Sequence, residues 1–313
     1  MRSAGPVRLG LEAESSMPSN DRNRVLPPAT EGPLLTWLLT TLKAMPRTRV
    51  KQLLARGQVT VNGTPITQFD HPLAPGDRVA IATVRNDPAG LVLRQAGVTI
   101  VYQDDDLIAI DKPAGLLSVA TSTERADTAF ARLNAYLGAR REGRPFVVHR
   151  LDRETSGLLL FARSADVRDQ LQARWHTVTK TYLAIVEGSP AETAGVVENY
   201  LVEGRDLRVR AFDRARPGSK RAVTRYRVLS AQAKCSLLQV ELQTGRKHQI
   251  RVHLAGLGCP VIGDPTYGAK SEPAGRLGLH ASRLSFDHPV TEQRLDLESE
   301  LPNELRRAGW KGK

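Results

Sequence analysis

The sequence predicts an α+β fold, with a mixed, mainly antiparallel sheet in a large domain and a small α+β domain before it. Apolar segments of strand length outnumber helical patterns, and strands and helices do not alternate strictly, as they would in a doubly wound fold. The 313 residues suggest two domains of about 150 residues each. Hydrophobic residues make up 41% and charged residues 25%, which excludes a disordered, collagen-like or membrane-spanning chain.

The charge balance favours a polyanionic partner. Lys and Arg number 45 against 33 Asp and Glu, a formal net charge of +12, and nucleic acid is the usual partner of such a chain. A generally basic proteome would give the same balance. The longest apolar stretch, residues 157–162, is far shorter than the roughly 20 residues of a membrane span. We expect a cytoplasmic protein without a membrane partner, because no apolar signal core is present and Cys235 and Cys259 are too few for a disulfide framework.

Composition and turn signals divide the chain into five segments. The small domain combines a helix over residues 34–42, a second helix over 47–55 and a hairpin at Asn62-Gly63, a strong two-residue turn signal. The expected segments are a disordered tail at 1–30, the small domain at 31–84, a linker at 85–97, the large domain at 98–300 and a basic tail at 301–313.

Positive charge without any acid marks the second helix. The cations are Arg47, Arg49, Lys51 and Arg56. Such a run can grip backbone phosphates, and the alternative is an ordinary solvated helix face. Residues 47–63 together with Pro75-Gly76-Asp77 resemble the S-four type RNA-binding module, and depart from it at Pro46-Arg47-Thr48, where many members have a serine-containing turn. The resemblance implies that Arg47 and Lys51 bind RNA.

A carboxylate stands at the end of a predicted strand in the segment 146–157. Asp152 follows an apolar strand and precedes the turn Thr155-Ser156-Gly157, a position where catalytic groups are common. Its carboxylate could act as a nucleophile, a base or a metal ligand. The alternative is a structural pair with an arginine in a surface turn.

A second cluster, in residues 242–253, places Arg246 at a predicted strand-to-helix junction. A guanidinium there could keep a buried carboxylate ionised by charge and hydrogen bonding, and the alternative is a surface basic cluster. His248 and His253 lie five residues apart, which does not put both on one helix face. Because the two cysteines are distant in sequence, we expect no zinc site and no other metal.

The two segments together resemble the RluA-type pseudouridine synthases. The pattern His-Arg-Leu-Asp-x-x-Thr-Ser-Gly is matched in full, and so is Thr-Gly-Arg-x-His-Gln-Ile-Arg. The matching blocks lie, in chain order, at 106–116, 149–157, 180–182, 244–251 and 259–268. The resemblance covers about residues 34–290 and implies an isomerase that needs no cofactor or metal.

The resemblance also implies roles for single residues. Asp152 would be the nucleophile, which attacks the sugar or abstracts a ribose proton once the target uracil has flipped out of the RNA stack. Arg246 would pair with Asp152 and keep it ionised, and Tyr182 would stack on the flipped base. The substrate-binding set would include Arg150, which fills the gap left by the base, Ile250, which packs against the base, and His149.

A basic segment at residues 205–227 predicts a longer RNA-binding surface. It holds nine Lys and Arg against Asp206 and Asp213, and we expect a strand–loop–strand arm that closes on RNA. Lys220 and Arg221 open its second strand, which resembles the corresponding family strand. A solvated loop is the alternative.

The expected partner is structured RNA, and large-subunit ribosomal RNA comes first because relatives with the extra N-terminal module mostly act there. Ser118-Val119-Ala120 stand where many members carry a His-Pro pair, which leaves the substrate subgroup open. Transfer RNA, or a non-catalytic RNA-binding protein that would lack Asp152 or Arg246, are the alternatives. A glycoside hydrolase would need a second carboxylate near Asp152, and only Glu154 is close in sequence. We expect a monomer.

Overall fold

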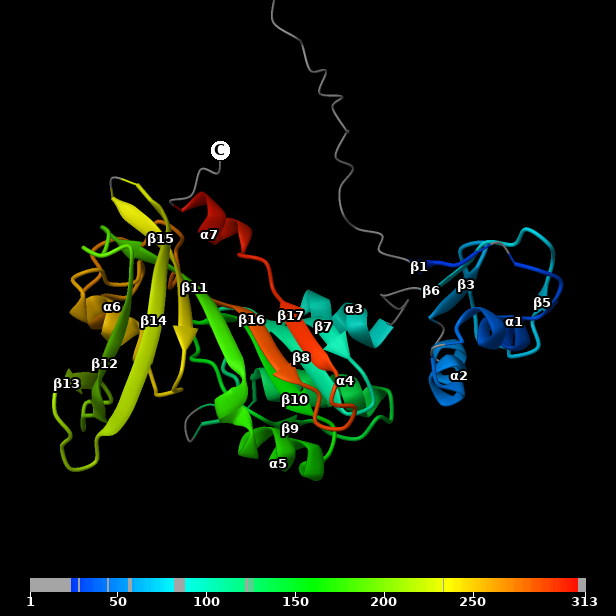
Figure 1. Ribbon diagram of the computed structural model, residues 1–313, viewed down its shortest axis with the longest axis horizontal. Helices are drawn as coiled ribbons and strands as arrows, with labels where there is room; N and C mark the ends of the chain where they lie inside the picture. The colour runs from blue at the N-terminus through cyan, green and yellow to red at the C-terminus, as the bar shows by residue number, and fades with distance from the viewer. Residues whose placement is uncertain are drawn as a thin grey trace, which may run out of the picture. The chain divides into compact units, whose positions relative to one another are not determined.

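The computed structural model describes residues 24–308 except residues 28, 44, 56–57, 82–87, 122–123, 125 and 233. The chain divides into two compact units, Met1–Asp87 and Pro88–Lys313 (Figure 1). Each unit has an apolar core of its own. Residues 1–23 and 28 of the predicted tail, which spans residues 1–30, lie outside the described residues, as does Arg56 of the basic helix.

In its described part, the first unit packs two helices and two small sheets around one core. Its elements are α1 (Leu34–Thr41), α2 (Arg47–Ala55), β1 (Arg24–Val25), β2 (Gly32–Pro33), β3 (Val59–Val61), β4 (Thr64–Ile66), β5 (Pro72–Leu73) and β6 (Val79–Ile81), paired as β1-β6-β3-β4 and β2-β5. Val50, Leu53 and Leu54 of α2 are buried, because their spacing places them on one helix face. The hairpin forms at Asn62 and Gly63, whose φ values of +51° and +83° suit a two-residue turn.

The second unit contains one eleven-stranded sheet in its described part, mixed and mainly antiparallel as the sequence predicts. Its strands are β7 (Thr99–Gln103), β8 (Leu107–Lys112), β9 (Phe146–Val147), β10 (Ser156–Ala162), β11 (Thr179–Glu187), β12 (Ala194–Glu203), β13 (Val209–Phe212), β14 (Lys220–Ala231), β15 (Cys235–Leu242), β16 (Leu279–Asp287) and β17 (Arg294–Glu298). The main order is β13-β12-β14-β15-β11-β16-β10-β8-β7, with β17 beside β16 and β9 beside β10. Between the described strands of this sheet, the β10–β16 pairing is parallel and the others are antiparallel.

Helices cover both faces of the sheet around β8 and β10 (Figure 1). The helices that the structure describes in the whole second unit are α3 (Pro88–Gln95), α4 (Ala129–Ala139), α5 (Ala165–Ala173), α6 (Gln249–Gly256) and α7 (Asn303–Arg307), with short 3₁₀ helices η1 (Trp175–Thr177) and η2 (Pro265–Tyr267). Leu159 and Phe161 of β10 pack with α4, whereas Leu158 and Leu160 pack with α5. Both faces of β10 are therefore apolar, which explains its unbroken apolar sequence. No helix in the described segments is long and apolar enough to cross a bilayer.

The parallel pairing brings two distant segments into close contact at the start of β10. Gly157 has a φ of +111°, and a Cβ at this position would lie 2.3 Å from the carbonyl oxygen of Ala281. Glycine is required here because it alone lets the backbones of β10 and β16 approach so closely. The turn that carries Asp152 enters the sheet at this contact.

Three segment boundaries differ from the prediction. Residues 88–95 of the predicted linker form α3, which buries Leu93 in the α4 core. Arg24–Val25, inside the predicted tail, form β1 and pair with β6. In the predicted basic tail, α7 buries Leu305. In each case a few apolar residues within a polar stretch gain order from a tertiary partner, which local composition does not reveal.

Candidate active site

Asp152 lies in the turn between β9 and β10, and the backbone is anchored on both of its sides. Before it, the buried Ser118 hydroxyl donates to the Leu151 carbonyl oxygen at 2.8 Å and accepts from the Leu151 amide at 3.0 Å. After it, the Lys112 ammonium donates to the Arg153 carbonyl oxygen at 3.1 Å. The Asp152 side chain itself is 31% exposed. The two anchors fix the direction of a carboxylate that solvent can still reach.

Lys112 is a fully buried lysine whose ammonium group is surrounded by carbonyl oxygens. Besides Arg153, it donates to the carbonyl oxygens of Pro113 at 2.9 Å and Leu116 at 2.8 Å. Burial lowers the pKa of Lys112 to about 7, against the opposing effect of the Glu154 charge. A titratable group therefore stands directly behind the Asp152 turn.

Two N–H groups from the α6 segment face the Asp152 carboxylate. Arg251 Nη1 lies 3.9 Å and His248 Nε2 lies 4.0 Å from Asp152 Oδ2. The Arg251 guanidinium also makes a bidentate pair with the buried Asp264, with Nε to Oδ2 at 2.6 Å and Nη2 to Oδ1 at 2.7 Å. Burial opposes the charge of Arg251, but Asp264 and then Asp152 outweigh it and raise the pKa of Arg251. Arg251 is thus a fixed cation beside Asp152.

Arg246, the predicted partner of Asp152, does not pair with it. The Arg246 side chain is exposed, and its Nε donates to the Arg221 carbonyl oxygen at 3.1 Å. Arg251 takes the place that the sequence assigned to Arg246. The reason is that α6 begins only at Gln249, so Arg246 precedes the helix, whereas Arg251 lies on it and has the buried Asp264 as a second partner.

Tyr182 on β11 lies next to this carboxylate. It packs against the two core clusters on either side and pairs in register with Ala281, the residue that contacts Gly157. Burial, and then the charge of Asp152, raise the pKa of Tyr182 above its ordinary value. The structure therefore brings Tyr182 and Asp152 together and keeps the phenol protonated.

His149 has structural contacts in place of the predicted contact with substrate. Its ring stacks on Trp175 with centroids 4.6 Å apart, and its Nε2 accepts the Leu160 amide at 3.0 Å. Burial and the nearby Lys180 charge lower the pKa of His149 to about 3, so the ring is neutral. The ring therefore holds the segment before Asp152 against β10.

The remaining predicted binding residues divide into exposed and buried ones. Arg150 is exposed beside Asp152, and Arg47 and Lys51 are exposed on α2 of the first unit. Ile250 is only 4% exposed and packs into the core beneath α6. The cations are accessible to a polyanion, whereas Ile250 offers little surface to a ligand in this arrangement.

The predicted basic arm consists of β13, β14 and the loop between them, paired on β12. All nine of its Lys and Arg residues are exposed. Arg210 and Arg221 form ion pairs with acids at 2.6 and 2.7 Å. Arg214 and Lys220 make no ion pair with any residue that the structure describes. The arm therefore presents cations whose charge is not neutralised by the protein.

The sequence patterns did not single out several residues of this site. Arg251 is the last residue of the matched block at 244–251, and Asp264 lies in the block at 259–268, so the family resemblance includes both residues. Lys112 likewise lies in the block at 106–116. Ser118 carried no such signal, because it stands where the sequence departs from the family pattern.

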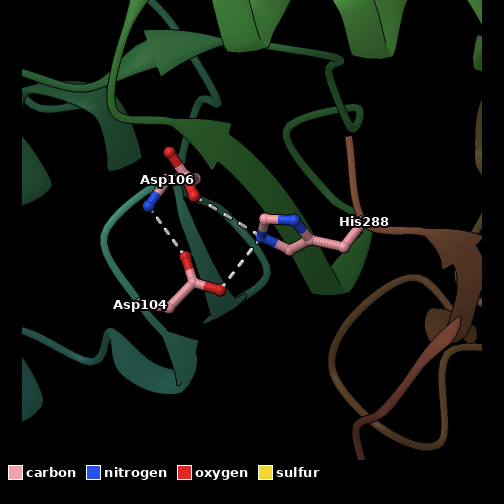
Figure 2. A group of neighbouring side chains, drawn as sticks. All are labelled: Asp104, Asp106 and His288. Carbon is pink, nitrogen blue, oxygen red and sulfur yellow. Dashed lines mark hydrogen bonds and ion pairs between the residues drawn. The ribbon is translucent and has the colours of Figure 1, made fainter. Parts of the chain in front are cut away.

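Asp104, Asp106 and His288 form a group of possible metal ligands in the described chain (Figure 2). His288 Nε2 lies 3.1 Å from Asp104 Oδ2 and 4.0 Å from Asp106 Oδ2. The other ring nitrogen, Nδ1, accepts the amides of Val290 and Thr291 at 3.2 and 3.1 Å, so the ring proton is on Nε2. A protonated nitrogen has no lone pair for a metal. The three side chains therefore join the β7–β8 turn to the segment after β16 by a hydrogen bond and charge.

A cavity of about 470 Å³ lies behind the Asp152 turn, lined in part by Lys112, Ser156, Arg276 and Glu304. The Arg276 guanidinium is committed within its wall, to Glu304 at 3.0 Å and to the Ser156 hydroxyl at 2.6 Å. The cavity therefore offers no unpaired arginine to a phosphate, and Asp152 is not part of its lining.

The chain is similar to several known proteins. Residues 106–256 match the family model for RNA pseudouridylate synthase. The RNA pseudouridine synthase YlyB of Bacillus subtilis (strain 168) is 33% identical, over 86% of this chain and 90% of its own. Ribosomal large subunit pseudouridine synthase D of Vibrio cholerae serotype O1 is 32% identical, over 83% of this chain and 84% of its own.

Among solved structures, human RNA pseudouridylate synthase domain containing 4 aligns with a TM-score of 0.57 and 29% identity. The alignment covers 70% of this chain and 96% of the human chain. The family-model match contains Asp152, Tyr182 and Arg251, and the structural match confirms the predicted fold class.

We expect Lys112 to make stability depend on pH. Its folded-state pKa of about 7 lies below the ordinary value of 10.5, so between these values the unfolded chain binds more protons than the folded one. The free energy of unfolding should therefore rise with pH across this window and fall as the pH drops towards 7. Lys112→Met should remove this component, which urea unfolding at several pH values in the window measures.

Lys270→Met is the matched control, because Lys270 is exposed. It should keep the slope of the wild-type protein. If Lys112→Met and wild-type stabilities ran parallel over the whole window, Lys112 would be protonated throughout and the prediction would be wrong.

Proposed function

We propose that this chain, which belongs to the RNA pseudouridine synthase family, isomerises specific uridines in large-subunit ribosomal RNA and uses Asp152 as its catalytic carboxylate. Its family makes it an isomerase that acts on RNA. The observation that carries the rest is the Asp152 carboxylate, anchored between Ser118 and Lys112 and faced by Arg251 and His248.

The reaction breaks the bond between N1 of uracil and C1′ of ribose and forms a bond between C5 and C1′. The hydrogen on C5 leaves as a proton and N1 gains one, so the product is an isomer and no electrons are exchanged. All its atoms come from the substrate and solvent, which supports the expectation that no cofactor takes part. The target base must leave the stack before the bond can be reached.

The carboxylate of Asp152 serves either of two routes. It attacks C1′ and forms a transient ester, or it removes a ribose proton after the bond to N1 has broken. In both routes a carboxylate oxygen is the reacting atom, and Arg251 Nη1 lies 3.9 Å from Asp152 Oδ2. The ring of Tyr182, whose hydroxyl is protonated, would stack on the flipped uracil. The exposed Arg150 would fill the gap that the base leaves in the RNA.

The substrate assignment is supported by the relative named ribosomal large subunit pseudouridine synthase D. Transfer RNA is the alternative substrate. A non-catalytic RNA-binding role is less well supported, because Asp152, Tyr182 and Arg251 are all present and close together. We further propose a cytoplasmic monomer in which the S-four-like first unit binds RNA through Arg47 and Lys51, and the arm adds Lys220 and Arg221.

Asp152→Asn should fold and bind RNA but form no pseudouridine, because it keeps the shape of the side chain and removes its charge. Pseudouridine mapping of total RNA from cells that lack the gene, complemented with either form, measures this. Glu154→Gln is the control and should restore every site. Loss of large-subunit sites with rescue by the intact gene alone supports enzyme, residue and substrate together. Turnover by Asp152→Asn beyond trace deamidation would refute the role of Asp152.

Arg251→Lys should lower kcat by about 10²-fold, because lysine keeps the charge but loses the bidentate pair that aims the guanidinium. Arg246→Lys is the matched change and should leave kcat close to the wild-type value. Release of tritium from RNA labelled at C5 of uridine reports both rates. The reverse order of the two variants would restore Arg246 as the partner of Asp152.

Changing Arg214, Arg216 and Lys220 together to Glu should weaken RNA binding and flatten its salt dependence. Each lost phosphate contact lowers the slope of log affinity against log salt by about 1. The control changes Lys234, Lys270 and Arg294, which are equally exposed but lie outside the arm, to Glu. Equal affinity and equal slope for the two triple variants would remove the arm from the RNA interface.

A further inference from the structure

Tyr267, at the end of η2, contacts both N–H groups that face Asp152. Its hydroxyl oxygen lies 2.9 Å from His248 Nδ1, and the two rings meet edge-on with centroids 5.7 Å apart. The Arg251 guanidinium carbon lies 5.1 Å from the centroid of the same ring, within the range of a cation–π contact. A single side chain therefore supports the two groups that face the carboxylate.

The hydrogen-bond partners of Tyr267 fix the direction of its proton. The hydroxyl oxygen accepts the backbone amide of Val209 at 3.1 Å, which leaves its own hydrogen available to donate to His248 Nδ1. Nδ1 is then an acceptor and the imidazole proton is on Nε2, the nitrogen that faces Asp152 Oδ2. Burial raises the pKa of Tyr267 and lowers the pKa of His248, which is consistent with a protonated hydroxyl and a neutral ring.

The backbone at His248 is itself strained towards this geometry. Its φ is +54°, in the left-handed region that residues with a Cβ seldom adopt. Strain of this kind persists where the surroundings over-determine a conformation, and it clusters at functional sites. Here it turns the imidazole from the start of α6 towards Asp152.

The same segment is joined to the basic arm. Val209, which donates to Tyr267, is the first residue of β13. The neighbouring Arg208 side chain donates to the Thr266 carbonyl oxygen, and Lys247, next to His248, pairs with Glu203 at the end of β12. The start of β13 and the end of β12 thus meet the segment that carries Tyr267 and His248.

We propose that Tyr267 is a positioning residue: it holds His248 in the tautomer whose Nε2–H faces Asp152, and ties that orientation to the seating of the basic arm. The proposal rests on the catalytic role proposed for Asp152. Neither Tyr267 nor Val209 touches the carboxylate, so their effect must pass through His248 and Arg251.

Tyr267→Phe tests the hydroxyl alone, because phenylalanine keeps the ring that Arg251 contacts. We expect kcat to fall by about tenfold. Tyr226→Phe is the control: Tyr226 is buried, whereas Tyr267 is half-buried, and the Tyr226 hydroxyl makes no hydrogen bond with a described residue. Equal kcat values for Tyr267→Phe and the wild type would overturn the proposal.

Nitrogen-15 NMR of histidine-labelled full-length protein supplies a readout that a loss of stability would not mimic. The wild type should show His248 as the neutral tautomer with its proton on Nε2, assigned by the signal missing from His248→Gln. In Tyr267→Phe, the Nδ1 signal should shift as its donor is lost and the tautomers should mix. An unchanged His248 spectrum would overturn the proposal whatever the kinetics show.

Two substitutions of His248 distinguish the effect of losing its N–H donor from the effect of changing the side-chain volume. Glutamine keeps an N–H group near the Nε2 position and methionine does not, while both have the same backbone requirement at φ +54°. His248→Gln should retain severalfold more kcat than His248→Met, and equal losses would overturn the proposal. If the wild type formed no pseudouridine at all, the proposed function would fail, whereas the NMR comparison in the RNA-free protein would still decide the hydrogen-bond chain.

Discussion

The arrangement around Asp152 depends on the buried ion pair between Arg251 and Asp264. Their side chains are 9% and 0% exposed, and two charges so far from water are stable only when each satisfies the other. Removing one partner of such a pair costs about 3–5 kcal/mol. The bidentate geometry fixes the plane of the guanidinium, so that its remaining nitrogen faces Asp152. The first turn of α6, the segment before η2 and the Asp152 turn are therefore held in one arrangement.

Arg251 and the cations of the arm differ in how strongly salt screens their charge. Arg251 is buried and paired, so salt screens it little, and it acts on one carboxylate at short range. The cations of the arm are exposed, and their field reaches about 10 Å into solvent at ordinary salt before it is screened. A short-range charge suits the placement of one side chain, and a long-range field suits the capture of a polyanion.

The fold class was predictable from strand-length apolar segments, and Asp152 could be proposed as a candidate because an acid at a strand end is a local signal. Which of Arg246 and Arg251 faces Asp152 could not be predicted, because both arginines fit a basic cluster and the outcome depends on α6 starting at Gln249. The anchors at Ser118 and Lys112 join residues 33 and 41 positions apart, which no local pattern records. For the same reason the sequence predicted a linker and a tail where α3 and α7 form, because distant partners order these two helices.

The contact between Gly157 and Ala281 also has a consequence for how the chain is made. Strands β10 and β16 are parallel neighbours, joined at Ser156 and His280 by side chains 124 positions apart, and the segment between them holds the whole arm and α6. Pairings of such separation form late, because the loop must be closed before the contact stabilises it. A growing chain therefore exposes the cations of the arm before β16 has been synthesised, and the turn that holds Asp152 acquires its final neighbour in one of the last steps of folding.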